Sequence, residues 1–429
     1  MIEKCLKNSY FCGAFDLVLR CKKGRMKILQ LCKKFPYPLK DGESIAVTSL
    51  SRSLHRLGCE ISLLAMNTRK HYFPIDQLPA HFNHYKTIET VAIDNRVKPW
   101  AALRSLLSEG DSYHISRFLS GNYERQLKAL LQAEDYDIVQ LETPYLSPYI
   151  PVVRRYSEAA VVMRAHNVEH EIWERISANT RFGPKRWYLN KLTDRLRRYE
   201  IQQLSAYDLL AAITERDLAY FRKMGYDGPA TVTPIGIESS RYKPNFASYE
   251  QPLSLSFIGS LDWMPNQEGL RWFLEHVWPS LRQRHPDMKL HVAGRNTPSW
   301  LYRLNTPGLQ VEGEVPSAPD FINAHSLMIV PLLSGSGMRA KILEGMALGK
   351  VVLTTPVGLE GIRAKHRKEV LVADSPQAFV DEVSWAIKEQ SQLCALGKAA
   401  RRLVLEHYDS LEVARRLMKA YSELTVEAF

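Results

Sequence analysis

Short apolar runs alternate with amphipathic stretches along most of this chain, and this alternation narrows the possible folds more than any other feature. The apolar run at 26–32 has the length and composition of a buried strand. After it, apolar residues recur at the spacing of one helix face, at Ile45, Val47, Leu50, Leu54 and Leu57. Gly58 stands where a helix C-cap glycine is expected, and a second apolar run follows at 61–66. The pattern predicts two parallel strands joined by a right-handed helical crossover.

The same alternation continues in two series. Further strands are predicted at 137–142, 160–165, 208–214, 253–259, 289–294, 326–332, 351–355 and 370–374, with a long helix at about 266–284. We interpret this as an α/β protein with two tandem doubly wound Rossmann-like domains, at 26–236 and 237–408. An amphipathic helix at 409–429 fits either domain and can cross back to the first. Ligands bind at the carboxyl ends of strands in such sheets, so two domains facing each other would form an interdomain cleft.

The charge balance restricts the class of partner. The chain has 429 residues, and its 57 Lys and Arg exceed its 46 Asp and Glu by +11. This excess suits a polyanion, an anionic membrane surface or a negatively charged small substrate. Nucleic acid is not expected, because the basic residues are not interleaved with stacking aromatic residues. No apolar stretch reaches the roughly 18 residues of a membrane span. Six cysteines without a CxxC pair argue against a disulfide scaffold or a zinc ribbon and favour a cytoplasmic protein.

Residues 1–25 differ from the rest of the chain. They hold three of the six cysteines, and their six basic residues face two acidic ones. They lack the continuous apolar core of a secretory signal, and Met26 directly precedes the first predicted strand. We expect this extension to be disordered or not native, with a short membrane-contacting arm as the functional alternative.

The segment 335–355 carries the strongest functional pattern, and it follows a predicted strand. Gly335 and Gly337 allow tight turns and close approach by a ligand, before a helix that begins around Met338. The free N–H groups of a helix start bind anions, and Arg339 and Lys341 place cations at the same end. The residues alone leave two interpretations open, a diphosphate site or a glycine-rich loop beside a solvated helix face.

This segment resembles the donor-binding segment of the GT-B glycosyltransferases of family 4, also called glycosyl transferases group 1. In that family two glutamates flank the segment; the second matches Glu344, for which the resemblance implies a contact with the ribose of a nucleotide sugar. Ser336 occupies the first position, which puts in doubt any sugar contact of that glutamate. By the same resemblance Gly335, Ser336, Gly337, Met338 and Glu344 bind the donor. Arg339 and Lys341 are implied as catalytic residues that neutralise the leaving diphosphate.

Residues 257–279 resemble the first strand–loop–helix of the family's donor domain. The resemblance implies that Gly259 and Ser260 approach the donor phosphates and that Val311 to Pro316 lie beside the base. Asn266 is expected to open the helix as its N-cap. The aromatic residues of this region are expected in the core rather than at the ligand: Trp263, Trp272, Phe273 and Trp278.

In the first half, His166 directly follows the predicted strand at 160–165. It resembles the active-site histidine of the same family, which implies a contact with the transferred sugar. The letters around it also match the H-x-x-E-H zinc-protease pattern, with Glu169 and His170. That pattern needs both histidines on one helix face, whereas His166 is expected at a strand end.

The loop at 35–44 resembles the family's first loop, with Gly42 as the glycine of close approach. Asp41 and Glu43 are candidates for acceptor contacts or are solvated loop charges. Glu142, at the end of the predicted strand 137–142, is a further candidate for a side chain that faces the ligand. The helix at 183–200 is basic and amphipathic, which is typical of a solvated surface or of contact with an anionic membrane.

The resemblance implies a retaining glycosyltransferase that needs neither a bound metal nor a cofactor besides its nucleotide-sugar donor. The implied partners are the nucleotide sugar and a glycan or lipid-linked acceptor, at the inner face of the cell membrane, in cell-surface polysaccharide or glycolipid synthesis. Two alternatives remain open: a nucleotide-sugar epimerase of GT-B shape and a catalytically silent sugar-nucleotide-binding protein.

Overall fold

The computed structural model describes residues 25–39, 42–80, 82–96, 112–180, 182–335 and 337–427. The chain divides into two compact units, which are described separately. Unit 1 comprises Met1–Pro234 together with Val413–Phe429, and unit 2 comprises Ile235–Glu412. The expectations for residues 1–24, for Asp41 and for Ser336 lie outside the described residues.

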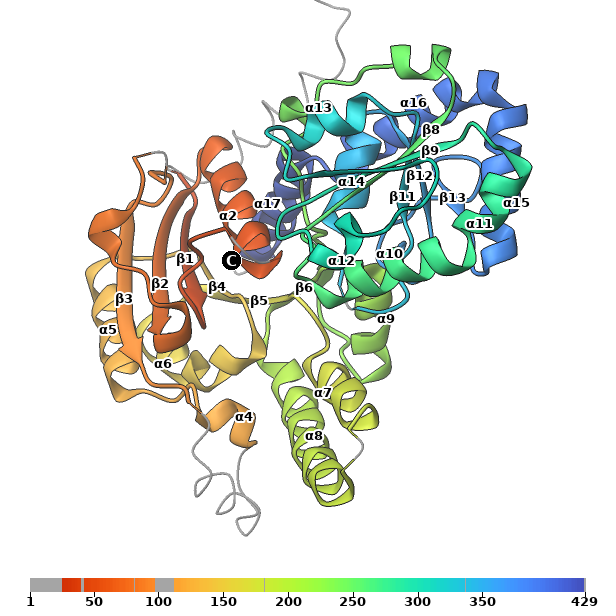
Figure 1. Cartoon of the computed structure of the whole chain (residues 1–429). Coiled ribbons are helices and arrows are strands. Elements are labelled where there is room, and N and C mark those ends of the chain that lie inside the picture. Colours follow the sequence, from red (N-terminus) through yellow and green to blue (C-terminus); the bar gives the residue numbers. More distant parts are fainter. Residues whose placement is uncertain are drawn as a thin grey trace, which may run out of the picture. The chain divides into compact units, whose positions relative to one another are not determined.

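Unit 1 is built on a seven-stranded sheet in the order β3-β2-β1-β4-β5-β6-β7 (Figure 1). All neighbouring strands pair in parallel. The strands are β1 Lys27–Cys32, β2 Glu60–Thr68, β3 Thr87–Ile93, β4 Ile138–Leu141, β5 Ala160–Ala165, β6 Leu209–Ala212 and β7 Ala230–Val232. The strand order reverses between β1 and β4, which is where open parallel sheets bind ligands.

Helices cover both faces of this sheet. They are α2 Gly42–Arg56, α4 Tyr113–Ser116, α5 Gly121–Ala133, α6 Ile150–Tyr156, α7 Glu169–Ala178, α8 Gly183–Gln203, α9 Glu215–Lys223 and α17 Ser410–Glu427. Leu29 and Leu31 pack with α5 and α6 on one face, and Ile28 packs with α2 and α17 on the other. Because successive side chains of β1 are buried on opposite faces, the strand is mostly apolar, with Gln30 as a buried polar residue.

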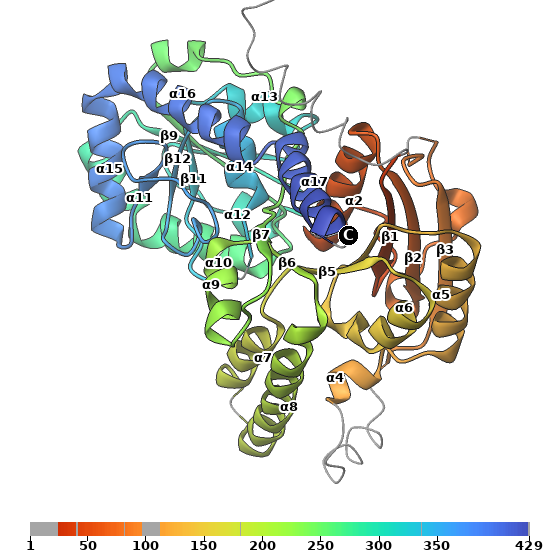
Figure 2. The ribbon, with the colours of Figure 1, turned by 180° about the vertical axis from the view of Figure 1, so that it is seen from behind.

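The C-terminal helix α17 contributes directly to the core of unit 1. Val413, Ala414, Leu417 and Tyr421 are buried in the same cluster as the apolar residues of α2, and Figures 1 and 2 show both helices on one face of the sheet. The Tyr421 hydroxyl donates to the Gln140 side chain, which lies in β4. The chain therefore returns to unit 1 after completing unit 2.

Unit 2 is built on a six-stranded parallel sheet in the order β10-β9-β8-β11-β12-β13. The strands are β8 Ser254–Ile258, β9 Lys289–Ala293, β10 Leu309–Gly313, β11 Leu327–Val330, β12 Val351–Thr354 and β13 Leu371–Val372. The helices are α10 Met264–His276, α11 Trp278–Arg284, α12 Ser299–Tyr302, α13 Ala318–Asn323, α14 Ala340–Ala347, α15 Pro376–Lys388 and α16 Gln390–His407. The order reverses between β8 and β11, which marks the equivalent ligand position. The two-domain Rossmann-like architecture expected from the sequence is confirmed.

Three local expectations for unit 2 were wrong. The helix expected at 266–284 is two helices, because Pro279 in the first turn of α11 lacks the N–H that a continuous helix needs. Trp263, not Asn266, is the N-cap of α10, and Asn266 lies inside the first turn. Trp263 is 41% exposed, whereas Phe273 and Trp278 are in the core as expected.

Candidate active site

The donor-side candidates of unit 2 converge on the carboxyl ends of β8 and β11. Lys341 lies in the first turn of α14, and its Nζ donates to Asn266 Oδ1 at 2.6 Å. The same Nζ lies 3.5 Å from the carbonyl oxygen of Ile258, the last residue of β8. Asn266 in turn donates to the Ser260 carbonyl oxygen at 2.8 Å. The side-chain amide of Asn266 therefore connects Lys341 of α14 with the loop that follows β8, through one hydrogen bond to each.

The protein around Lys341 disfavours the charged form of its amine. Burial and, to a smaller extent, the neighbouring Arg339 guanidinium lower the pKa of Lys341 to about 7, against the opposing effect of Glu344. A bound anion would restore the ordinary pKa of this amine, because an opposite charge favours the protonated form.

Arg339 stands at the N-cap position of α14, and its side chain is buried. It donates to the Gly337 carbonyl oxygen inside the loop. Gly335 and Gly337 have φ angles of +117° and +79°, a region that favours glycine. A Cβ on Gly335 would lie 3.1 Å from Arg339 Nη2, so a side chain there would press on the guanidinium. The loop after β11 therefore holds Arg339 beside the helix start.

The remaining donor candidates differ in what surrounds them. A Cβ on Gly259 would lie 2.8 Å from Asn266 Nδ2 and 3.0 Å from Lys341 Nζ, so a larger residue there would displace the ends of these two side chains. The Ser260 hydroxyl donates to Asp262 at 2.5 Å on the exposed side of the loop. Met338 is buried, and α14 begins at Ala340 rather than at Met338 as expected.

Glu344 lies one turn into α14, and the Tyr242 hydroxyl donates to its Oε1 at 3.0 Å. Burial raises the pKa of the Glu344 carboxyl, although Tyr242 and Lys341 oppose the shift. Sequence reasoning missed Tyr242 entirely, since nothing in its local sequence marks it. It also assigned Asn266 a capping role rather than the contact with Lys341.

In unit 1, His166 directly follows β5 and faces a buried carboxylate. His166 Nε2 lies 2.7 Å from Glu142 Oε2, and Arg164 Nη1 lies 3.1 Å from the same oxygen. Gln30 donates to Glu142 Oε1 at 2.5 Å. Burial opposes the charge of Glu142, but Arg164, His166 and Gln30 hold its pKa at about 2. Glu142 is therefore an ionised acceptor at neutral pH.

The charge on Glu142 decides the orientation of the imidazole. An ionised carboxylate only accepts hydrogen bonds, so the Nε2 atom that faces it carries the proton. In the neutral ring, His166 Nδ1 is then a hydrogen-bond acceptor. Glu142 thus fixes the tautomer and the orientation of the His166 ring, as a carboxylate beside a catalytic histidine does in other enzymes.

The zinc-protease interpretation of this run is not supported. His170 is fully buried in α7, where its Nδ1 lies 2.7 Å from Glu200 Oε2 and its Nε2 lies 3.2 Å from the Tyr220 hydroxyl. His166 has a different partner in Glu142. Across the described residues, neither histidine belongs to a group of three potential metal ligands.

The loop after β1 places charged residues at the carboxyl ends of the strands of the unit 1 sheet. Glu43 Oε2 lies 3.6 Å from Lys33 Nζ and 3.4 Å from Lys34 Nζ, and Lys33 also reaches Glu169 at 3.8 Å. Gly42 begins α2, and a Cβ added there would meet nothing within 4 Å, so the packing of the protein does not require glycine at this position. Sequence reasoning missed both lysines, although their position directly after a predicted strand was an available signal.

Two family models match the chain. Residues 41–241 match the model described as Glycosyltransferase Family 4, and residues 252–389 match the one described as Glycosyl transferases group 1. Among curated proteins, the chain is 27% identical over 172 residues to an "Uncharacterized 44.6 kDa protein in cps region" of Klebsiella pneumoniae. That alignment covers 38% of this chain and 44% of the relative, so it spans less than half of the relative's length.

Solved structures share the fold over nearly the whole chain. Sucrose-phosphate synthase from Thermosynechococcus elongatus is similar with a TM-score of 0.65 and 15% identity, over 94% of this chain and 100% of that one. HepE of Anabaena, solved in complex with UDP, is similar with a TM-score of 0.61 and 12% identity, over 94% of this chain and 100% of that one. The family matches in both units and the shared architecture agree with the resemblance found in the sequence. The chain belongs to the group 1 glycosyl transferases, also called glycosyltransferase family 4, and has the GT-B fold.

Proposed function

We propose that this glycosyltransferase moves a sugar from a nucleoside-diphosphate donor to an acceptor hydroxyl, with retention of the anomeric configuration and without a bound metal. The observation that carries the proposal is the pairing of Arg339 and Lys341 at the start of α14, with Lys341 held by Asn266 at the end of β8. The likeness to HepE of Anabaena, which has been solved with UDP and with UDP-glucose, supports a nucleotide sugar as the donor.

The chemistry follows from the charges. When the bond between the sugar and the donor phosphate breaks, negative charge develops on the leaving diphosphate. Arg339, Lys341 and the N–H groups at the start of α14 stabilise that charge. Glu344, whose carboxyl is oriented by Tyr242, accepts hydrogen bonds from the ribose hydroxyls. In this proposal, protein cations do the work that a divalent metal does in other transferases.

A ligand screen tests the proposal and its two alternatives. We expect one of UDP, GDP, ADP, TDP and CMP to bind in calorimetry, with an affinity that EDTA leaves unchanged. With the matching nucleotide sugar and an acceptor, NMR should show a product with the anomeric configuration of the donor. Conversion of the donor sugar without acceptor would indicate an epimerase, and binding without turnover would indicate a silent binding protein. No nucleotide binding at all would contradict the proposal.

His166 is proposed to contact the transferred sugar through Nδ1, since Nε2 faces Glu142. We expect His166→Ala to lower turnover by about 10²-fold or more while the circular dichroism spectrum stays that of the folded parent, because a lost positioning contact misplaces the reacting atoms. His55→Ala, at an exposed position at the end of α2, is the matched control. Full turnover in His166→Ala would remove this residue from the site.

The acceptor is proposed to be a glycan or a lipid-linked saccharide that contacts unit 1. The charged residues after β1 (Lys33, Lys34, Glu43 and Glu169) offer ionic and hydrogen-bonding groups at that sheet edge. A role in cell-surface polysaccharide or glycolipid synthesis at the inner face of the cell membrane fits such an acceptor.

Contact with an anionic membrane is proposed for the hairpin of α7 and α8, which pack on each other in unit 1 (Figure 1). At the start of α8, Phe182 is 66% exposed and Trp187 is 57% exposed. Lys185 and Arg186 between them are exposed as well. Exposed aromatic residues beside basic ones suit insertion at an anionic interface. None of the helices in the described ranges is long and apolar enough to cross a membrane.

Sedimentation with vesicles tests this contact. We expect the protein to pellet with vesicles that contain phosphatidylglycerol and to stay in solution with phosphatidylcholine alone. The double variant Phe182→Ser and Trp187→Ser should lower the membrane partition coefficient by about tenfold or more, because burial of such a side chain contributes about 1.5–3 kcal/mol. Tyr72→Ser is the control, since Tyr72 is 64% exposed elsewhere in unit 1. Equal binding by all three proteins would contradict the proposal.

A further inference from the structure

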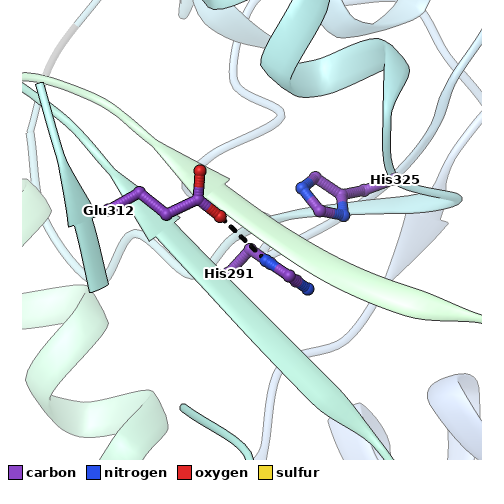
Figure 3. A group of neighbouring side chains, drawn as sticks. All are labelled: His291, Glu312 and His325. Carbon is purple, nitrogen blue, oxygen red and sulfur yellow. Dashed lines mark hydrogen bonds and ion pairs between the residues drawn. The ribbon is translucent and has the colours of Figure 1, made fainter. Parts of the chain in front are cut away.

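Two histidines and a glutamate meet on one face of the unit 2 sheet. Glu312 belongs to the segment 311–316, which the resemblance places beside the base of the donor. His291 lies in β9, Glu312 lies in β10 and His325 lies two residues before the start of β11. One potential ligand atom of each residue lies within 4.8 Å of the others (Figure 3). We propose that this cluster binds a divalent transition-metal ion, with Zn²⁺ as the best fit.

The strand geometry brings His291 and Glu312 together. His291 is the register partner of Gln310, so both side chains leave the sheet on the same face. Glu312 lies two residues further on that face, where the register shifts between Val311 and Gly313. Such irregularities re-aim a side chain and are common beside functional sites. His291 Nδ1 and Glu312 Oε1 are 2.8 Å apart, so two candidate ligand atoms already touch.

His325 completes the set from the other side. Its Nδ1 lies 3.1 Å from the Ser254 hydroxyl, which leaves Nε2 as the nitrogen available for coordination. A metal-bound histidine ordinarily donates its second ring N–H to an oxygen in this way. The His291 and His325 rings have centroids 4.1 Å apart, and Figure 3 shows the Glu312 carboxylate extending toward the space beside them.

Coordination requires the side chains to rearrange, because the two imidazole rings lie nearly face to face, with 32° between their planes. Tetrahedral zinc ligands at 2.0–2.2 Å from the ion lie about 3.3–3.5 Å from one another. The 2.8 Å contact between His291 and Glu312 would therefore widen as the ion replaces the proton that these atoms share, and the widest pair would close. The Glu312 side chain is 38% exposed and that of His291 is 15% exposed, so both have room to move.

The surroundings supply access and a place for water. The three residues line a pocket of about 450 Å³ together with residues 315–317, Asp320 and Phe321. A water in this pocket would supply the fourth ligand that three protein ligands leave open. Two imidazoles and one carboxylate favour Zn²⁺ and its neighbours over Mg²⁺ or Ca²⁺, which prefer all-oxygen sites.

A metal here would link the edge strand β10 to β9 and to the start of β11. We therefore expect it to stabilise unit 2, and no step of sugar transfer requires it. The inference does not depend on the proposed function, because it predicts a change in melting temperature on chelation and an unchanged affinity for the nucleotide.

The test uses the full chain without an affinity tag, stripped with EDTA and desalted. Calorimetry with Zn²⁺ should give one site per chain, and Zn²⁺ should raise the melting temperature. Co²⁺ should give the visible absorption of a four-coordinate ion with nitrogen and oxygen ligands. His291→Ala and Glu312→Gln should each weaken Zn²⁺ binding by about 100-fold or more, since even the loss of an outer-shell partner costs 10- to 100-fold.

His276→Ala is the matched control, because His276 is an exposed histidine at the end of α10 in the same unit. Its Zn²⁺ affinity should equal that of the parent protein. Glu312 is at the surface, so Glu312→Gln keeps the test decisive even if a histidine variant fails to fold. Absence of Zn²⁺ binding by the parent, or equal binding by the parent and by the folded variants of His291 and Glu312, would overturn the inference.

Discussion

We expect Arg339→Ala and Lys341→Ala each to weaken binding of the nucleoside diphosphate by about 30- to 150-fold. Each substitution removes a charge-assisted hydrogen bond to phosphate, which contributes about 2–3 kcal/mol, and every 1.4 kcal/mol is a factor of ten in affinity. Both cations lie at the start of α14, where the N–H groups of the first turn would bind the same diphosphate in the proposed function. Isothermal calorimetry at constant ionic strength measures the effect.

Lys289→Ala is the matched control, because Lys289 is an exposed lysine at the amino end of β9. The amino ends of the strands lie opposite the carboxyl ends at which Lys341 is found. It should bind the nucleotide as the parent does. Unchanged affinity in both Arg339→Ala and Lys341→Ala would remove the phosphate site from α14.

The pH dependence of nucleotide affinity shows whether the effect of Lys341→Ala comes from the lost charge or from a changed shape of the site. The pKa of Lys341 is about 7 in the ligand-free protein, because burial disfavours its charged form. The diphosphate binds the protonated amine, so binding takes up a proton when the pH is above 7. The affinity of the parent should therefore fall by up to about tenfold per pH unit between pH 7 and the higher pKa of the complex. This slope should be absent in Lys341→Ala, and an equal slope in both proteins would contradict the assignment.

The second large effect concerns stability. We expect Glu142→Gln to lower the free energy of unfolding by about 3–5 kcal/mol, because it leaves the charge of Arg164 buried without its counter-charge. Both residues are 1% exposed, and Arg164 Nη1 lies 3.1 Å from Glu142 Oε2. Urea denaturation measures the change, and Glu124→Gln at an exposed position of α5 is the control.

The dependence of stability on acid pH is a second measurement on the pair of Glu142 and Arg164. The pKa of Glu142 is about 2 in the folded protein, below the value of about 4.3 for an unfolded chain. Its contribution to stability is therefore present above pH 4.3 and is lost as the pH falls from there through 2. Glu142→Gln should lack this part of the pH dependence, while the double variant Glu142→Gln and Arg164→Met should recover much of the lost stability. A single variant as stable as the parent would show that the pair is not a structural charge pair.

The sequence predicted the central strands and the edge strand β13, and it missed the other three edge strands of the two described sheets for a physical reason. β1, β4 and β5 are covered on both faces, so they are mostly apolar, with one buried polar or charged residue in each (Gln30, Gln140 and Arg164). β3, β7 and β10 were not predicted, and each forms an edge of its sheet. Their side chains are mostly partly exposed, as in Glu89 and Glu312, so their apolar pattern is interrupted.

Local and distant parts of the site were predictable to different degrees. The glycines, Arg339 and Lys341 lie within a few residues of one another, and the loop and helix start that hold them form from that segment alone. The contact of Lys341 with Asn266 joins residues that are 75 positions apart, and that of Glu344 with Tyr242 joins residues 102 positions apart. A local pattern carries no information about such pairs.

By itself, the sequence determined the α/β class, the two successive domains, the family and the cationic loop, because periodicity and short motifs are local properties of a chain. Only the tertiary structure decided that Glu142, Arg164 and His166 form one hydrogen-bonded cluster, since β4 and β5 must first lie side by side. It likewise decided that His291, Glu312 and His325 meet on one face. Strand register, and not sequence spacing, sets which side chains share a site.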